Sequence, residues 1–196
     1  LVFAARIPER IGFATSSGSR LYTTKVAYRD DLHHAARLLL LSRPNGREPT
    51  DEEMRPSLAP GAAERSVVDE LLRSRGVEPE ERLIALAPGS VWATKRWPYY
   101  EQLARALADA GRIVVVGGAD DRALAAEIVA AVPGAVDTTG ALPLLASADL
   151  IGRCAVLVTN DSAPLHLASA MGTPTVAIFG PTVPEFGFGP LADAPL

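Results

Sequence analysis

The sequence contains very little cysteine and histidine. Cys154 is the only cysteine among 196 residues, and there are three histidines. A single cysteine cannot close a disulfide within the chain or supply a zinc cluster. His33 and His34 open a helix-like stretch with no further metal ligands in pattern, so no metal site is expected. We expect Cys154 to be a small buried side chain beside the apolar run 155–158.

Positive charge is also limited. Lys and Arg number 19 against 23 Asp and Glu, which gives a formal net charge of −4. Nucleic-acid backbones are held mainly by Lys and Arg, so an acidic chain of this kind is not expected to bind nucleic acid. A small phosphate pocket is still compatible with this charge, because it needs only one or two cations.

Long apolar runs are missing as well, and we expect the natural chain ends to lie outside this sequence. No apolar run approaches the roughly 18 residues of a membrane span. The sequence opens at Leu1 and closes at Leu196 directly after a proline- and glycine-rich stretch. We therefore expect a piece of a longer protein, in which an N-terminal signal cannot be judged.

Several common cofactor and catalytic motifs are absent. Residues 117–121 follow an apolar run but lack the G-x-G-x-x-G spacing of nicotinamide-binding loops. The serine-rich stretches lack a nucleophile elbow, and spacing assembles no Ser-His-Asp triad. The acidic pairs at 30–31 and 120–121 are adjacent rather than spaced as in a metal–nucleotide clamp.

What is present divides into two regions. Residues 1 to about 60 contain a helix-like stretch at 31–41 and then a segment rich in Pro, Gly, Glu and Arg at 43–61, which is typical of a linker. From about residue 66, short apolar runs alternate with amphipathic stretches. The expected strands are 83–87, 113–116, 135–136, 155–158 and 175–179, and the expected helices are 66–75, 99–110, 120–132, 142–153 and 163–171. This alternation predicts a doubly wound α/β domain with a parallel sheet covered on both faces.

Three loops follow the carboxyl ends of the expected strands, where such sheets bind ligands. They are residues 88–98, 117–121 and 159–164. The second loop carries Asp120 and Asp121, which could bond a ribose or a base. Its alternative interpretation is an ordinary helix start with favourable first-turn charge.

The loop at 159–164 is the most informative. Its small residues let a ligand approach, and the free amides and dipole of the following helix favour an anion. His166 lies one helical turn beyond Ser162, so both can face the same ligand. The alternative is that Asp161 or Ser162 is an ordinary N-cap and that His166 is partly buried with a structural partner.

The loop at 88–98 contains two neighbouring cations, Lys95 and Arg96. Together with the backbone amides of the preceding glycine turn, they could neutralise a diphosphate. The alternative is a solvated Lys-Arg pair, with Trp92 and Trp97 as packing residues.

Five short motifs occur in order along the second region, and together they resemble a known family. They are Pro88-Gly89-Ser90, Lys95-Arg96-Trp97-Pro98, Val116-Gly117-Gly118, Asn160-Asp161-Ser162 with His166-Leu167-Ala168, and Ile178-Phe179-Gly180-Pro181-Thr182. They resemble the C-terminal domain of glycosyltransferase family 9, the ADP-heptose:lipopolysaccharide heptosyltransferases. Residues 7–13 and 23–26 resemble the end of that family's N-terminal domain.

The resemblance implies a GT-B fold of two Rossmann-like domains. Residues 1–62 would be the tail and linker of the acceptor domain, and residues 63–196 a truncated ADP-heptose-binding domain. The implied activity is metal-independent, cofactor-free, inverting transfer of heptose to the lipopolysaccharide inner core, Kdo-lipid A or heptosyl-Kdo-lipid A. It would take place in the cytoplasm, at the inner face of the inner membrane. Residues 11–29 are closer to enzymes that add the second heptose, but the sequence does not decide which transfer is performed.

By the same resemblance, one residue has a catalytic role and nine others bind the donor. Lys95 would stabilise charge on the donor phosphates. The donor site would be lined by Ser90, Val91, Asp120, Asp121, Leu142, Asp161, Ser162, Ala163 and His166. Ala163 departs from the glycine usual in the family, so the backbone is expected to approach the donor less closely there. The family's acidic general base has no counterpart here, and we expect the chain alone to be inactive.

Two alternatives remain open at this point. The chain could belong to another GT-B enzyme with a different sugar nucleotide, since one fold hosts many donors. It could also be a non-catalytic nucleotide-binding or scaffold fragment. Nucleotide preference distinguishes the three hypotheses.

Overall fold

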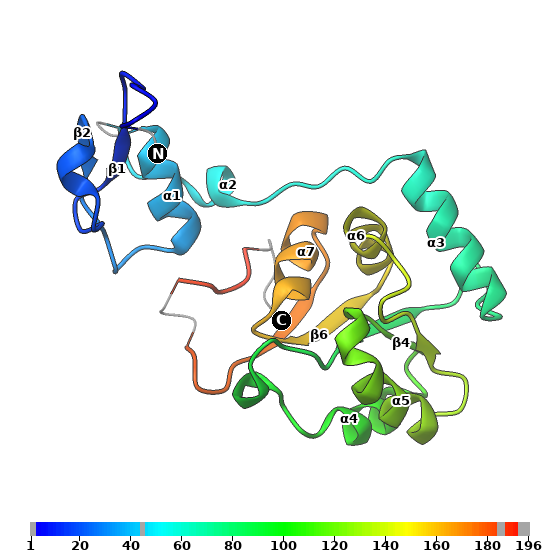
Figure 1. The fold of residues 1–196 in the computed structure, drawn as a ribbon. Coiled ribbons are helices and arrows are strands. Elements are labelled where there is room, and N and C mark those ends of the chain that lie inside the picture. Colours follow the sequence, from blue (N-terminus) through cyan, green and yellow to red (C-terminus); the bar gives the residue numbers. More distant parts are fainter. Residues whose placement is uncertain (1–2, 44–45, 184–186, 192–196) are drawn as a thin grey trace. The chain divides into compact units, whose positions relative to one another are not determined.

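The computed structural model describes residues 3–43, 46–183 and 187–191 (Figure 1). The chain divides into two compact units, the first made of residues up to 54 with 187–189, the second of residues 55–183 with 190–191. The predicted domain boundary at 62/63 stays a prediction; residues 55–61 fall in the second compact unit. Residues 192–196, at the expected truncation, lie outside the described residues.

The second unit is built on a five-stranded parallel sheet. Its strands are β3 (Leu83–Ala87), β4 (Arg112–Val115), β5 (Val136–Asp137), β6 (Val156–Asn160) and β7 (Thr175–Ile178), in the order β5-β4-β3-β6-β7. Ile84 pairs with Ile113 on one side and with Val156 on the other. Every residue of β3 is buried, as a central strand covered on both faces requires.

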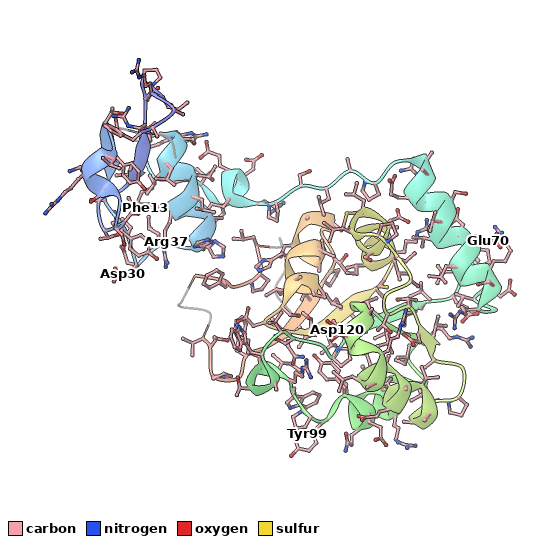
Figure 2. All side chains as sticks on the ribbon, in the orientation of Figure 1. Phe13, Asp30, Arg37, Glu70, Tyr99 and Asp120 are labelled. Atoms are coloured by element: carbon pink, nitrogen blue, oxygen red, sulfur yellow. The ribbon has the colours of Figure 1, made fainter. Side chains whose placement is uncertain are left out.

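Five helices cover the two faces of this sheet. They are α3 (Ala62–Ser74), α6 (Leu144–Gly152) and α7 (Ala163–Met171) on one face, and α4 (Tyr100–Leu107) and α5 (Arg122–Ala131) on the other. Strand residues alternate accordingly: Leu83 and Ala85 pack toward the first face, Ile84 and Leu86 toward the second. The predicted doubly wound α/β domain is therefore confirmed, and the side chains between its layers are drawn in Figure 2.

Cys154 is part of the core between the sheet and α3, α6 and α7. It is 5% exposed, and its thiol donates to the Leu150 carbonyl. Burial raises the pKa of the Cys154 thiol to about 12. This bears out the expected structural role, because a thiol with so high a pKa is not a nucleophile at neutral pH.

The first unit contains the helix expected at 31–41, observed at His34–Ser42, and short elements that the sequence pattern does not reveal. Strands β1 (Ile11–Phe13) and β2 (Thr24–Val26) form a parallel pair, and the helices are η1 (Ser19–Leu21), α1 (His34–Ser42) and α2 (Asp51–Met54). The buried Arg37 of α1 donates to the Tyr28 hydroxyl at 2.9 Å and to the carbonyls of Asp30 and Leu32. One side chain thus holds the turn between β2 and α1.

The start of α1 should respond to pH through His33. Nδ1 of His33 accepts from the Ala35 amide at 3.1 Å, and Nε2 lies 3.2 Å from the Gly189 carbonyl, so the cap needs the neutral ring. Burial lowers the pKa of His33 below its ordinary value, against the opposing effect of the Gly189 carbonyl. The contribution of the cap is complete above the unfolded pKa of about 6.5 and is lost as pH falls through the folded value.

We therefore expect the protection of the Ala35 amide against hydrogen exchange to fall as pH is lowered from 7 to 5, after correction for the intrinsic exchange rate. A His33→Asn variant keeps a capping acceptor that does not titrate, so its protection should stay level. Nuclear magnetic resonance measures both. An equal pH dependence in the variant would contradict the assigned role.

The buried hydroxyl of Tyr100 is expected to be dispensable. Tyr100 is 4% exposed at the start of α4, its hydroxyl has no hydrogen-bond partner among the described residues, and burial raises its pKa. Removing an unsatisfied buried polar group recovers part of its desolvation cost, so Tyr100→Phe should raise the free energy of unfolding by up to about 1 kcal/mol. Urea denaturation measures this. Tyr99→Phe, at a residue 54% exposed, is the matched control and should change nothing. A marked loss in Tyr100→Phe would show a partner for the hydroxyl.

Candidate functional site

The strand order places a crevice at the carboxyl ends of β3 and β6, the two strands between which the order reverses. From β3 the chain moves outward through β4 to β5, then returns to the other side of β3 for β6 and β7. Ligands bind at such a switch point, beyond the carboxyl ends of the strands. The loops that leave β3 and β6, predicted from the sequence to be ligand loops, flank this point.

Asn160, the last residue of β6, joins these two loops. It is fully buried; its side-chain oxygen accepts from the Trp97 amide at 3.0 Å, and its nitrogen donates to the carbonyls of Pro88 at 2.8 Å and Gly89 at 3.3 Å. A single amide thus holds the start and the end of the 88–97 loop against β6.

Lys95 and Asp161, 66 residues apart, form an ion pair beside this junction. Nζ of Lys95 lies 2.5 Å from Oδ2 of Asp161, and the side chains are only 21% and 9% exposed. The Thr182 hydroxyl donates to the same oxygen at 2.9 Å. Lys95 of the 88–98 loop therefore lies beside the 159–164 loop, and its charge is balanced by Asp161.

The loop between β4 and α5 lies against the loop that follows β3. Asp121 accepts from the Gly118 amide at 2.9 Å, which makes it an N-terminal capping residue in agreement with the alternative interpretation. Its carboxylate also lies against Gly89, where an added Cβ would come 2.1 Å from Oδ1. A side chain at position 89 would therefore require the Asp121 carboxylate to move.

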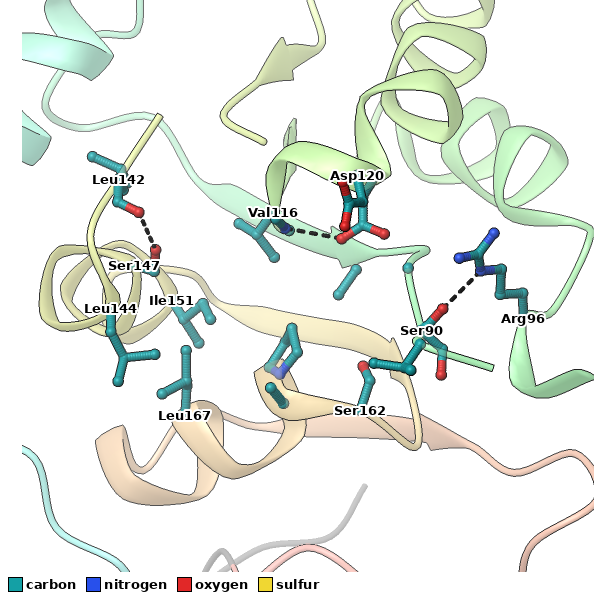
Figure 3. Close-up of a pocket in the computed structure, with 18 residues that line it drawn as sticks. Ser90, Arg96, Val116, Asp120, Leu142, Leu144, Ser147, Ile151, Ser162 and Leu167 are labelled. Atoms are coloured by element: carbon teal, nitrogen blue, oxygen red, sulfur yellow. Dashed lines mark hydrogen bonds between the residues drawn. The ribbon is translucent and has the colours of Figure 1, made fainter. Parts of the chain in front are cut away.

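These loops enclose a pocket of about 540 Å³, a volume typical of small-molecule sites (Figure 3). One end is apolar and is lined by Leu142, Leu144, Ile151 and Leu167. The opposite end is polar, and its lining residues include Ser90, Ser162 and Arg96.

The polar end coincides with the start of α7. Ser162 is the N-cap residue. Pro164 has no N–H and the Leu165 amide donates to the Ser162 carbonyl at 3.1 Å, so the first-turn amide left for a ligand is that of Ala163. This amide and the helix dipole favour an anion. The Ser90 hydroxyl, on a residue 8% exposed, makes no hydrogen bond to any described residue. The polar end therefore offers several donors to a ligand.

The predicted site residues divide into two groups. Those that line the pocket are Ser90, Val91, Asp120, Asp121, Leu142, Ser162 and Ala163. Lys95 and Asp161 pair beside the pocket, and His166 is exposed on α7; none of the three is part of the pocket wall.

Sequence reasoning missed much of the apolar wall. Leu144, Ser147 and Ile151 of α6 all line the pocket, and their spacing of three and four residues places them on one helix face. That spacing was available in the sequence as a signal.

The two tryptophans of the 88–98 loop differ from each other. Trp97 packs against Tyr99 and Tyr100, whereas Trp92 is 67% exposed and is not a packing residue.

Metal-ligand clusters and membrane-spanning helices are both missing from the described residues. No group of three or more His, Cys, Asp or Glu side chains in the described part of the chain could hold a metal ion. Among the same residues, no helix combines the length and the apolar character needed to cross a membrane.

Curated heptosyltransferases are similar to part of this chain. Lipooligosaccharide heptosyltransferase 2 of Haemophilus influenzae is 37% identical over 123 residues, 58% of this chain and 35% of that protein. Lipopolysaccharide heptosyltransferase 2 of Escherichia coli is 36% identical over 116 residues, 55% of this chain and 33% of that protein. The chain thus spans about a third of the length of these curated relatives.

Solved structures match over nearly the whole chain. The E. coli ADP-heptose lipopolysaccharide heptosyltransferase II structure has a TM-score of 0.79 and 27% identity, covering 98% of this chain and 62% of that one. The structure of a family 9 glycosyl transferase from Veillonella parvula has a TM-score of 0.82 and 28% identity, covering 97% and 56%. These likenesses confirm the predicted GT-B-type α/β fold. A model of glycosyltransferase family 9 (heptosyltransferase) matches residues 1–194, and the chain belongs to this family.

Proposed function

We propose that this chain forms the donor-binding side of a heptosyltransferase that takes ADP-heptose. The observation that carries the proposal is the two-ended pocket at the switch point of the sheet. Membership of family 9 and the names of the relatives, which are heptosyltransferases, support the same substrate class.

The two ends of the pocket fix an orientation for the donor. The adenine lies among Leu142, Leu144 and Leu167, because a flat aromatic base gains most from apolar walls. The diphosphate lies at the polar end, against the Ser90 hydroxyl and the first turn of α7. The ribose then comes near the acidic loop, where the exposed Asp120 can accept from its hydroxyls.

The reaction that this arrangement serves is a direct, inverting displacement. An acceptor hydroxyl oxygen forms a bond to the anomeric carbon, the bond to the diphosphate breaks, and ADP leaves with an added negative charge. Lys95, the Ala163 amide and the dipole of α7 stabilise that charge electrostatically, without a metal. The hydroxyl proton passes to a general base, and we assign this role to none of the described residues.

The acceptor in this proposal is the inner core of lipopolysaccharide, presented at the cytoplasmic face of the inner membrane. The names of the relatives support the lipopolysaccharide class. Two of them are called heptosyltransferase 2, which favours transfer of the second heptose over the first. Peripheral contact with the membrane follows from where such an acceptor resides.

Calorimetry on the 196-residue chain tests the donor assignment. We expect ADP to bind at least about tenfold more tightly than UDP or GDP, because the apolar walls of the pocket are expected to fit adenine better than uracil or guanine. A preference for UDP or GDP would indicate another sugar-nucleotide enzyme. Absence of binding by the folded chain would indicate a non-catalytic scaffold fragment.

Two neighbouring leucines of α6 provide a matched pair of variants. Leu144 is 64% exposed and lines the pocket, whereas Leu145 is 37% exposed and does not. Leu144→Glu places a carboxylate beside the base and should weaken ADP at least about tenfold. Leu145→Glu should leave the affinity within about twofold, because the added charge is equal but lies outside the pocket. Equal effects of the two variants would contradict the placement of the base.

A further inference from the structure

The two neighbouring cations of the 88–97 loop have different environments. Lys95 forms the ion pair with Asp161 and is not part of the pocket wall. Arg96 lines the pocket and has no ion-pair partner among the described residues. It is the only Lys or Arg among the described residues that line the pocket, which also include Asp120 and Asp121. A phosphate that enters the pocket therefore meets Arg96 as its positively charged side chain.

Hydrogen bonding fixes how the Arg96 guanidinium is presented. Its Nε donates to the Ser90 carbonyl at 2.9 Å, and its two terminal nitrogens donate to no described residue. The anchored Nε holds the plane of the group beside Ser90, as Figure 3 shows. The free edge with two parallel N–H groups is the edge that binds phosphate in a bidentate manner.

The two cations lie at different places relative to the pocket, so each would contact a different phosphate of the donor. A phosphate inside the pocket, next to the nucleoside, meets Arg96 together with Ser90. Lys95 is reached only by a group that extends beyond the lining residues, toward Asp161 and Thr182. In a nucleoside diphosphate sugar, that group is the second phosphate, which carries the sugar.

We propose that Arg96 binds the phosphate attached to the nucleoside and that Lys95 serves the phosphate attached to the sugar. This assignment rests on the proposed function, since it presupposes a nucleoside diphosphate in the pocket. It makes Arg96 the residue that distinguishes a nucleotide from a nucleoside, and Lys95 the residue that distinguishes a diphosphate from a monophosphate.

Calorimetry on the 196-residue chain with ADP, AMP and adenosine tests the division. Arg96→Gln should weaken ADP and AMP at least about tenfold and leave adenosine unchanged, because a charge-assisted contact to one phosphate is lost. Lys95→Met should weaken ADP by a similar factor and leave AMP unchanged. Arg96→Lys should recover part of the loss, since it restores the charge without the bidentate edge.

Arg122, at the exposed start of α5, provides the control for net charge. Arg122→Gln removes the same charge outside the pocket wall and should leave all three affinities within about twofold at physiological salt. Thermal unfolding of each variant confirms that it is folded.

Three results would overturn the assignment. Unchanged AMP affinity in Arg96→Gln would show that Arg96 does not contact the phosphate attached to the nucleoside. Equal weakening of adenosine would show that Arg96 acts only by holding the loop through Ser90. A wild-type chain that is folded but binds none of the three ligands would overturn the proposed function and this inference together, whereas the first two results leave the donor site standing.

Discussion

Replacing Asn160 with aspartate should lower the free energy of unfolding by about 3 kcal/mol at pH 7. The two side chains have the same shape, so the acceptor for the Trp97 amide is kept. The donor to Pro88 and Gly89 becomes an oxygen facing two carbonyls at 2.8 and 3.3 Å in a fully buried site. A buried charge without a counter-charge and two carbonyls that have lost their donor account for an effect of this size. Urea denaturation of the wild type and the variant measures it.

The pH dependence of this variant is its internal control. The buried carboxyl is favoured in its protonated form, so its folded pKa lies above the unfolded value of about 4. Its protonated form can donate to Pro88, and that contribution is lost as pH rises from about 4 through the folded pKa. The difference from wild type should therefore be smallest in acid. A difference below about 1 kcal/mol at pH 7 would contradict the role of Asn160 in joining the loops.

Breaking the Lys95–Asp161 pair should have a comparable effect. Asp161→Ala leaves the Lys95 ammonium, 21% exposed, without its counter-charge and removes the acceptor of Thr182. Removal of one partner from a largely buried pair should lower the free energy of unfolding by about 3 kcal/mol. Lys95→Met leaves Asp161, 9% exposed, with only the Thr182 hydroxyl and should also be destabilising.

The double variant shows whether the two charges act on each other. Because both uncompensated charges are then absent, its loss should be smaller than the sum of the single losses by at least about 1 kcal/mol. Glu101 and Arg105, an exposed pair on α4, form the matched control and should show a coupling of about 0.3–0.5 kcal/mol. Strictly additive losses at Lys95 and Asp161 would mean that their contact contributes nothing to stability.

Much of the second unit could be predicted from the sequence because its signals are local. The apolar run 83–87 and the small-residue helix 163–171 are observed with the same bounds. The ends of buried parallel strands share one edge of a sheet, so the alternating pattern alone predicts that the loops after them lie together. The strands of the first unit could not be predicted, since three-residue runs such as Ile11–Phe13 carry no periodicity.

The site itself was predictable in its location but not in its contacts. Lys95 and Asp161 were both expected at the ligand edge, yet their mutual pairing depends on side-chain directions across 66 residues of chain. For the same reason the sequence does not predict that Arg96 donates to the Ser90 carbonyl. This contact distinguishes the environment of Arg96 from that of Lys95. Loop positions follow from topology, whereas the ion pairs between loops follow from packing.

The central claim is that the pocket between the β3 and β6 loops holds the nucleoside diphosphate of a sugar donor. A crystal structure of the chain with ADP tests it most directly. We expect the adenine between Leu142 and Leu167, and the phosphates within hydrogen-bond distance of Ser90 and the Ala163 amide at the start of α7. A well-ordered ADP bound elsewhere, with this pocket empty, would contradict the account.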